Sequence, residues 1–141
     1  MENKELKPMV GVGVMVFKDG KILLGKRLGK HGSGEYAVPG GHLDYMESFE
    51  ECAKRETKEE SGIEIKNIRF LNLFNLKDYA PKHYVSIGLI ADWESGEPQV
   101  LEKDKIGDWA WYDIDDLPKP LFGSVSQYRE SYKTGKNYFD F

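Results

Sequence analysis

One predicted helix, from Ser48 to Ser61, constrains this chain more than any other segment. Ser48 followed three residues later by Glu51 is a capping-box signature, and Gly62 is a typical C-terminal stop. At about 100° per residue, the first half of the helix presents an apolar stripe, and the second half places carboxylates on the same side. The stripe consists of Phe49, Cys52 and Ala53, and the carboxylates are those of Glu56, Glu60 and, at its edge, Glu59.

Carboxylates on the inward face of a helix need a physical explanation. Partial burial adds a desolvation cost to their mutual repulsion, so either their pKa values rise or a cation lies among them. Oxygen ligands three and four residues apart suit Mg²⁺ or Mn²⁺. Arg55, the basic residue beside this face, is suited to orient a glutamate through a bidentate pair. The alternative is an ion-pair network on an ordinary surface helix.

The rest of the chain predicts several strands and one further helix, within one domain that covers residues 1–141. Of the 141 residues, 40% are hydrophobic, enough to form a core without a disulfide framework. Strands separated by two helices indicate an α/β (α+β) domain with a mixed β-sheet. The expected strands are Met9–Phe17, Ile22–Leu24, Tyr36–Val38, Ile68–Phe74, Tyr84–Trp93 and Gly107–Tyr112, and the second helix is Ser124–Tyr132.

The charge balance excludes some partners. The formal net charge is −4, which disfavours binding to the backbone phosphates of DNA or RNA. Residues 41–63 hold seven acidic and three basic residues, so this segment alone accounts for the whole net charge. Cys52 is the only cysteine, which excludes an internal disulfide and favours a reducing compartment. No apolar run approaches the roughly 20 residues that span a bilayer, so we expect a cytoplasmic protein with no membrane partner.

The same segment carries a family pattern. Residues 41–63 read GHLDYMESFEECAKRETKEESGI, which resembles the Nudix box. Its charged and glycine positions are Gly41, Glu47, Arg55, Glu56, Glu59, Glu60 and Gly62. Thr57 replaces the usual aliphatic residue, and its hydroxyl would need a partner. The likeness to the family extends over roughly residues 9–122. Within the Nudix hydrolase family, this sequence is similar to the MutT-type nucleotide pyrophosphatases.

This resemblance implies a fold, a reaction and a cofactor. The fold would be a Nudix α/β/α sandwich, and the enzyme would use Mg²⁺, with Mn²⁺ as an alternative, to hydrolyse a nucleoside diphosphate linked to a second group. By position, Glu56, Glu59, Glu60 and the Gly40 carbonyl would hold the metal, and Arg55 would orient a box glutamate. Glu47 would support the box or join a second ion. Glu102 and Asp104 are candidates for a distal acidic residue, of which Glu102 is the metal ligand that we favour.

The resemblance also implies how a nucleotide would bind. Arg27 is the favoured phosphate contact, and Gly40 and Gly41 would let the backbone approach the substrate. His42, Ser86 and Phe122, together with Tyr36, would lie near the base. The first substrate choice is a (deoxy)nucleoside triphosphate, normal or modified, that yields a monophosphate and pyrophosphate. The alternatives are ADP-ribose or another nucleotide sugar, and a non-catalytic nucleotide-binding regulator. Close relatives are often homodimers, so a homodimer is one assembly that the resemblance allows.

Overall fold

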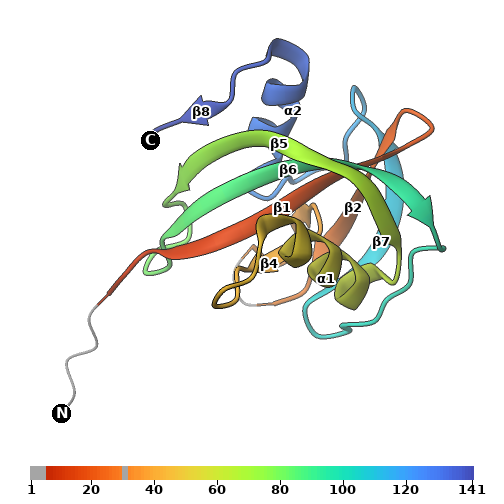
Figure 1. Ribbon diagram of the computed structural model, residues 1–141, viewed down its shortest axis with the longest axis horizontal. Helices are drawn as coiled ribbons and strands as arrows, with labels where there is room; N and C mark the ends of the chain where they lie inside the picture. The colour runs from red at the N-terminus through yellow and green to blue at the C-terminus, as the bar shows by residue number, and fades with distance from the viewer. Residues whose placement is uncertain (1–5, 30–31) are drawn as a thin grey trace.

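The fold is built around one mixed β-sheet. The computed structural model describes residues 6–29 and 32–141. Within them, ten elements follow the chain (Figure 1): β1 (Met9–Lys18), β2 (Lys21–Arg27), β3 (Tyr36–Ala37), β4 (Gly40–His42), α1 (Phe49–Ser61), β5 (Glu64–Leu76), β6 (Tyr84–Ser95), β7 (Ile106–Asp113), α2 (Val125–Thr134) and β8 (Tyr138–Phe139). No described helix is long and apolar enough to cross a membrane.

Strand β1 lies at the centre of the sheet. The strands run in the order β3-β2-β1-β6-β5-β8, β4 also pairs with β1, and β7 pairs with β2. The pairing of β1 with β6 is parallel, whereas the pairings of β1 with β2 and β4 are antiparallel. Strand β1 therefore has β6 on one side and, on the other, β4 near its start and β2 near its end. This divergence of neighbours opens the sheet beside the first half of β1.

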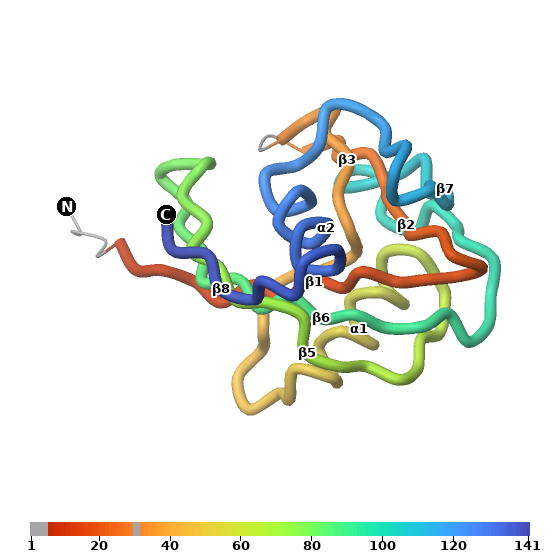
Figure 2. The backbone as a smooth tube through the Cα atoms, turned by 90° about the horizontal axis from the view of Figure 1, so that it is seen from above, coloured from red at the N-terminus to blue at the C-terminus, as the bar shows by residue number. Residues whose placement is uncertain are grey.

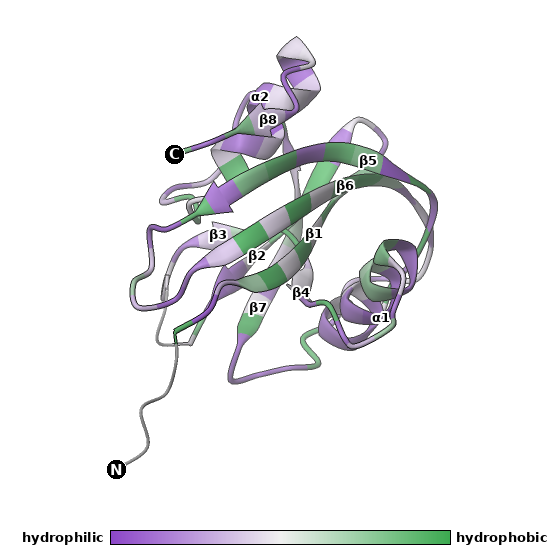
Figure 3. Cartoon of the chain, turned by 60° about the vertical axis from the view of Figure 1, so that its left-hand side comes forward, coloured by the Kyte–Doolittle hydropathy of each residue, from purple (hydrophilic) through white to green (hydrophobic). Residues whose placement is uncertain are grey.

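Each face of the sheet carries its own core, as the alternation of side chains in a strand requires. Val14 and Val16 of β1 pack with Cys52 and Ala53 of α1, whereas Met15 packs with Tyr128 of α2 and the strand residues around it. Figure 2 shows the helices on opposite sides of the sheet, and Figure 3 shows hydrophobic residues along the central strands. This is the expected α/β/α sandwich with a mixed sheet.

Helix α1 begins and ends where its sequence signals predict. The Ser48 hydroxyl accepts a hydrogen bond from the Glu51 backbone N–H, and the Glu51 carboxylate accepts one from the Ser48 backbone N–H. Gly62 ends the helix with a φ of 80°. The expected apolar stripe is partly wrong, because Phe49 is 47% exposed. Burial begins only one turn later, at Cys52, so the first turn of α1 extends beyond the packed face.

Two short strands were not expected from the sequence. Strand β4 is Gly40–His42, where the Pro-Gly-Gly run was expected to stop the chain, and it pairs with Gly11–Gly13 of β1. Strand β8 pairs with β5 only at Leu73 and Phe74. Strand β5 is also longer than expected, since it begins at Glu64 and contains three register shifts. Strand β4 forms through tertiary pairing with β1, since its two glycines carry little strand propensity of their own.

Candidate active site

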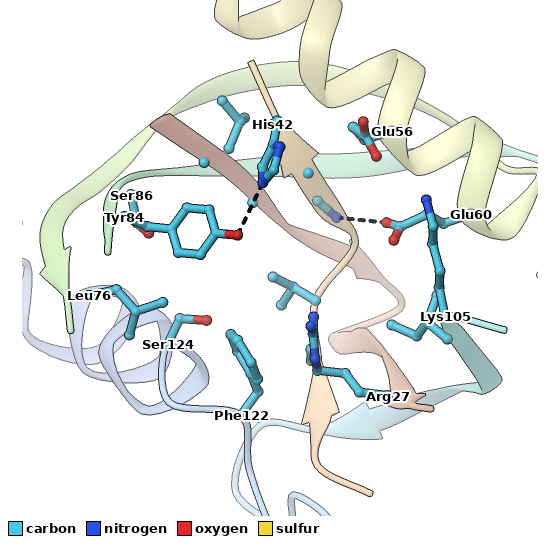
Figure 4. Close-up of a pocket in the computed structure, with 18 of the residues that line it drawn as sticks. Arg27, His42, Glu56, Glu60, Leu76, Tyr84, Ser86, Lys105, Phe122 and Ser124 are labelled. Carbon is cyan, nitrogen blue, oxygen red and sulfur yellow. Dashed lines mark hydrogen bonds between the residues drawn. The ribbon is translucent and has the colours of Figure 1, made fainter. Parts of the chain in front are cut away.

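A pocket of about 480 Å³ opens beside the first half of β1. Its wall brings together residues between Gly11 and Tyr128, several of which are labelled in Figure 4 around one space. Among the residues singled out by the sequence, those lining it are Arg27, Gly40, Gly41, His42, Glu56, Glu60, Ser86, Glu102 and Phe122. The tertiary structure thus gathers residues up to 95 positions apart, from Arg27 to Phe122, around one cavity.

Glu60 is the buried acidic group of this wall. It is 8% exposed, and the backbone N–H of Gly40 donates a hydrogen bond of 2.8 Å to its Oε1. Burial, with smaller contributions from the carboxylates of Glu56 and Glu102, raises the pKa of Glu60 to about 8 against the opposing effect of the Gly40 N–H. A carboxylate kept in such a place is strongly disposed to bind a proton or a cation.

Glu56 lies on the same wall, one helical turn before Glu60. Its pKa is raised, mainly by burial, although the Arg55 guanidinium opposes the shift with a hydrogen bond of 2.7 Å from Nη1 to Oε1. A Cβ atom on Gly41 would lie 2.3 Å from the Glu56 carboxyl carbon. Only glycine at position 41 therefore leaves room for this carboxylate to lie against β4.

Arg55 connects α1 to the loop that precedes it. Its Nε and Nη2 donate to the two oxygens of Glu47 at 2.7 and 3.0 Å, and Nη2 also donates to the His42 carbonyl at 3.2 Å. This bidentate pair, together with the Asp44 backbone N–H, lowers the pKa of Glu47 to about 2. Glu47 therefore fixes the Arg55 side chain by accepting two hydrogen bonds, and Arg55 in turn positions the Glu56 carboxylate at the edge of the pocket.

The structure separates the remaining acidic candidates. Glu102 lines the pocket, and its charge raises the pKa values of both Glu56 and Glu60. Asp104 is exposed and does not line the pocket. Glu59 is also outside the pocket lining, with its Oε2 at 3.4 Å from Arg55 Nη1. Of the two distal candidates, only Glu102 lies beside the acidic residues of α1.

Arg27 lies opposite the acidic wall and is held by an aromatic stack. Its guanidinium carbon is 4.3 Å from the centre of the Phe122 ring. Phe122 in turn stacks on Tyr79, with ring centres 4.5 Å apart and planes 3° from parallel. A guanidinium supported on an aromatic face keeps its donors directed to the side, which suits recognition of a phosphate or carboxylate.

His42, Tyr84 and Ser86 line the side of the pocket opposite Glu60 (Figure 4). His42 Nε2 and Tyr84 Oη lie 3.1 Å apart, within hydrogen-bond distance. Tyr36, which was expected near the base, does not line the pocket; its ring contacts Tyr112 edge-on at 6.0 Å. It belongs to the packing around the α2-side core instead, because its strand β3 is at the edge of the sheet.

Sequence reasoning missed several pocket residues. Lys82, Lys105, Leu76, Tyr84, Ser124 and Tyr128 also line the cavity. Two of them could have been found, because Tyr84 and Ser86 alternate along β6, and Lys105 follows Glu102 by three residues, with their charged groups 3.7 Å apart. Ser124 and Tyr128 could not, since their position depends on how α2 packs against the sheet.

The donor set fits a divalent cation, although the described residues do not already form a metal site. Among residues 6–29 and 32–141, no three His, Cys, Asp or Glu side chains converge closely enough to hold an ion. Glu56, Glu60 and Glu102 nevertheless share one wall, and the charge of Glu102 raises the pKa values of both Glu56 and Glu60. Hard oxygen donors that repel one another in a partly buried place are what Mg²⁺ and Mn²⁺ prefer.

Comparison with known proteins agrees with this arrangement. The family model described as the NUDIX domain matches residues 7–133, which include the whole pocket lining. This chain belongs to the Nudix family. Relatives that resemble it are named as a pyrophosphatase and as hydrolases, and this chain is a Nudix hydrolase.

Three relatives illustrate the range of similarity. An ADP-ribose pyrophosphatase from Methanocaldococcus jannaschii is 36% identical over 118 residues, 83% of this Nudix chain and 69% of the relative. An NAD-capped RNA hydrolase from Vibrio atlanticus is 36% identical over 74% of this chain, which spans only 37% of that relative's length. The crystal structure of a MutT NUDIX hydrolase from Burkholderia pseudomallei has a TM-score of 0.83 and 36% identity, covering 89% of this chain and 98% of that one.

Proposed function

We propose that this protein hydrolyses the phosphoanhydride of a nucleoside diphosphate linked to a second group, with Mg²⁺ as cofactor. The observation that carries the proposal is the Glu60 carboxylate, which is buried in the pocket wall beside Glu56 and Glu102 and across the pocket from Arg27. Acidic and basic groups around one cavity fit a polyphosphate that arrives with a cation. Packing alone would not retain a buried carboxylate there, because its desolvation is unfavourable.

Glu56, Glu59, Glu60 and the Gly40 carbonyl would hold the metal, with Glu102 as a further ligand and Mn²⁺ as an alternative ion. When bound, the ion neutralises phosphate charge and polarises the phosphorus centre. Glu59 reaches this set only if its side chain leaves Arg55, since it lies outside the pocket lining. Mg²⁺ accepts water in place of missing protein ligands, so a partial carboxylate set is sufficient.

The chain's own residues position the substrate and accept a proton. Arg27, Lys82 and Lys105 line the pocket and would contact the phosphates. Arg55 would orient Glu56 through the hydrogen bond that it already makes. Either a box glutamate or Glu102 would take the proton from the water that attacks the phosphoanhydride. The water oxygen bonds to one phosphorus atom of the P–O–P linkage, the bond from that phosphorus to the bridging oxygen breaks, and the two phosphorylated products leave.

The first substrate choice is a (deoxy)nucleoside triphosphate, normal or modified, cleaved to the monophosphate and pyrophosphate. The similarity to the Burkholderia MutT hydrolase, which extends over 98% of that chain, supports it. The second choice is ADP-ribose, supported by the name of the Methanocaldococcus relative. A regulator that binds nucleotides without turnover is the alternative of another class. The presence of every Nudix-box glutamate disfavours it, because a mere binding site does not need all of them.

Glutamate-to-glutamine variants test the reaction. We expect Glu56→Gln and Glu60→Gln to lower kcat by about 10²–10⁴-fold, since each loses a charge that the metal or the proton transfer needs. Glu50→Gln is the matched control, because Glu50 is on the same helix and exposed. The assay measures product release with Mg²⁺ from standard, oxidised and methylated dNTPs and from ADP-ribose.

Two outcomes would contradict the proposal. A near-normal rate in Glu60→Gln would remove this residue from the reaction. Tight nucleotide binding by the wild-type protein with no turnover on the whole panel would favour the regulator.

A further inference from the structure

The pocket has two chemically different ends. Figure 4 shows Glu56, Glu60, Lys105 and Arg27 toward one end, and Tyr84, Ser86, Leu76 and Ser124 toward the other. The first end is charged and suits phosphates and a cation. The second combines aromatic, aliphatic and hydroxyl side chains, a lining typical of sites for flat, neutral ligand groups.

The floor of the second end is made by the sheet itself. Gly13 of β1 is paired with Gly88 of β6, and the ring of Tyr128 from α2 lies directly over both. A Cβ atom on Gly13 would be 2.1 Å from Tyr128 Oη, and one on Gly88 would be 2.6 Å from Tyr128 Cε1. Two residues earlier along both strands, Gly11 is paired with Ser86. The absence of side chains at Gly13 and Gly88 therefore lets the Tyr128 ring lie directly against the sheet.

Three hydroxyl-bearing side chains line this end of the pocket. Tyr128 is 2% exposed, Ser124 is 7% exposed and Ser86 is 8% exposed, and all three line the pocket. None of their hydroxyls makes a hydrogen bond to any other residue that the structure describes, and Ser124, although it is the N-cap of α2, makes no side-chain cap bond. Three hydroxyls that border one cavity and make no hydrogen bond to the protein are available to a polar ligand, since each can both donate and accept.

We propose that the hydroxyls of Ser86, Ser124 and Tyr128 bind the polar edge of the nucleobase and set base preference. This proposal rests on the proposed function, because the phosphates must lie at the charged end for the base to reach the other. A hydroxyl both donates and accepts, so the three groups can match carbonyl and amino groups of a base. Tyr84 supplies an aromatic face for the ring plane.

The test compares binding of the four ribonucleoside 5′-monophosphates to wild-type protein and to Tyr128→Phe, Ser124→Ala and Ser86→Ala. Isothermal calorimetry without metal gives each Kd. We expect the ratio between the tightest and weakest base to fall about 5–10-fold in Tyr128→Phe, the effect of one hydrogen bond. Tyr132→Phe is the matched control, since Tyr132 is one turn further along α2, stacks on Phe17 at 4.7 Å and is outside the pocket lining.

Thermal melting separates this role from a structural one. Because the Tyr128 hydroxyl has no partner in the described structure, Tyr128→Phe should melt no lower than wild type. A lower Tm would indicate that the hydroxyl supports the fold and would overturn the proposal. Base ratios that stay unchanged in all three variants, or a wild-type protein that shows no base preference, would overturn it as well.

Turnover measurements keep the two proposals distinguishable. If the variants lose base preference in binding while no substrate is hydrolysed, the hydroxyl proposal holds and the enzymatic one fails. If substrates are hydrolysed with the same base preference in wild type and variants, only the hydroxyl proposal fails.

Discussion

Thr57 lies fully buried in the middle of α1, on the face that packs against the sheet. Its Oγ1 has no hydrogen-bond partner among the residues that the structure describes. Its backbone carbonyl does accept a hydrogen bond, from the Ser61 hydroxyl at 2.7 Å, so the backbone here is satisfied. The group of Thr57 that lacks a hydrogen-bond partner in the described structure is therefore its side-chain hydroxyl, at the position where the Nudix pattern has an aliphatic residue.

We expect Thr57→Val to raise the free energy of unfolding by about 1 kcal/mol, because valine has nearly the same shape and removes an unpaired buried hydroxyl. Urea unfolding followed by circular dichroism measures the change. Thr134→Val is a suitable control, since the Thr134 hydroxyl is exposed and donates to the Glu130 carbonyl. A loss of stability in Thr57→Val would mean that the hydroxyl has a partner which the described contacts omit.

At the scale of elements, Tyr79 joins three loops around the pocket. Its hydroxyl donates to Glu35 Oε1 at 3.0 Å, before β3, and accepts from the Gly123 backbone N–H at 2.7 Å, before α2. Tyr79 itself lies in the loop between β5 and β6. Its ring stacks on one face of the Phe122 ring, and the Arg27 guanidinium lies over the other face. Burial and the Glu35 carboxylate raise the pKa of Tyr79 to about 12, so the hydroxyl stays protonated and can donate.

Tyr79→Phe keeps the ring stack and removes only these two hydrogen bonds. We expect KM for the nucleotide substrate to rise about 3–10-fold with little change in kcat, because Arg27 loses its fixed support while the acidic wall is untouched. Steady-state kinetics on the best substrate of the panel gives both constants. Tyr45→Phe, on an exposed loop, is the control. A fall in kcat with unchanged KM would show that Tyr79 acts on the chemistry instead.

For the whole molecule, the raised pKa of Glu60, which lies within the acidic segment 41–63, makes the free energy of unfolding depend on pH. The pKa of Glu60 is about 8 in the folded protein against an ordinary 4.5, so between these values the folded state binds this proton more tightly than the unfolded state. The contribution of Glu60 is therefore fully present below about pH 4.5 and is lost as pH rises through about 8. The pKa of Glu47 is lowered from an ordinary 4.5 to about 2, so this residue changes the free energy of unfolding only at acidic pH, between these two values.

In EDTA, we expect the Tm of wild type to fall relative to that of Glu60→Gln as pH rises from about 5 to about 8, since glutamine stays neutral throughout. Differential scanning calorimetry across this range measures both proteins. Adding Mg²⁺ should reduce the wild-type decline, because an ion that binds the folded state alone stabilises it. Parallel curves for the two proteins in EDTA would contradict the assignment of this pH dependence to Glu60.

Local signals account for part of the fold. Helix α1 was predicted with its cap and stop, because Ser48, Glu51 and Gly62 act within one or two turns of chain. Strand β1 was expected at Met9–Phe17 and extends to Lys18, and α2 was expected at Ser124–Tyr132 and spans Val125–Thr134. Strand β4 was missed because its stability comes from the backbone of β1, which no short stretch of sequence reveals.

The candidate site was likewise predictable from the sequence only in part. By its spacing, the sequence alone placed Glu56 and Glu60 on one helix face beside Arg55, since a helix has a fixed period. Only the tertiary structure decided which residues meet them: it brought Glu102 to the acidic wall, left Asp104 outside, and directed Glu59 toward Arg55. It also placed Tyr128 over the glycines of β1 and β6, and Ser124 in the lining of the pocket. These contacts join distant segments through packing, and packing between distant segments has no local period in the sequence.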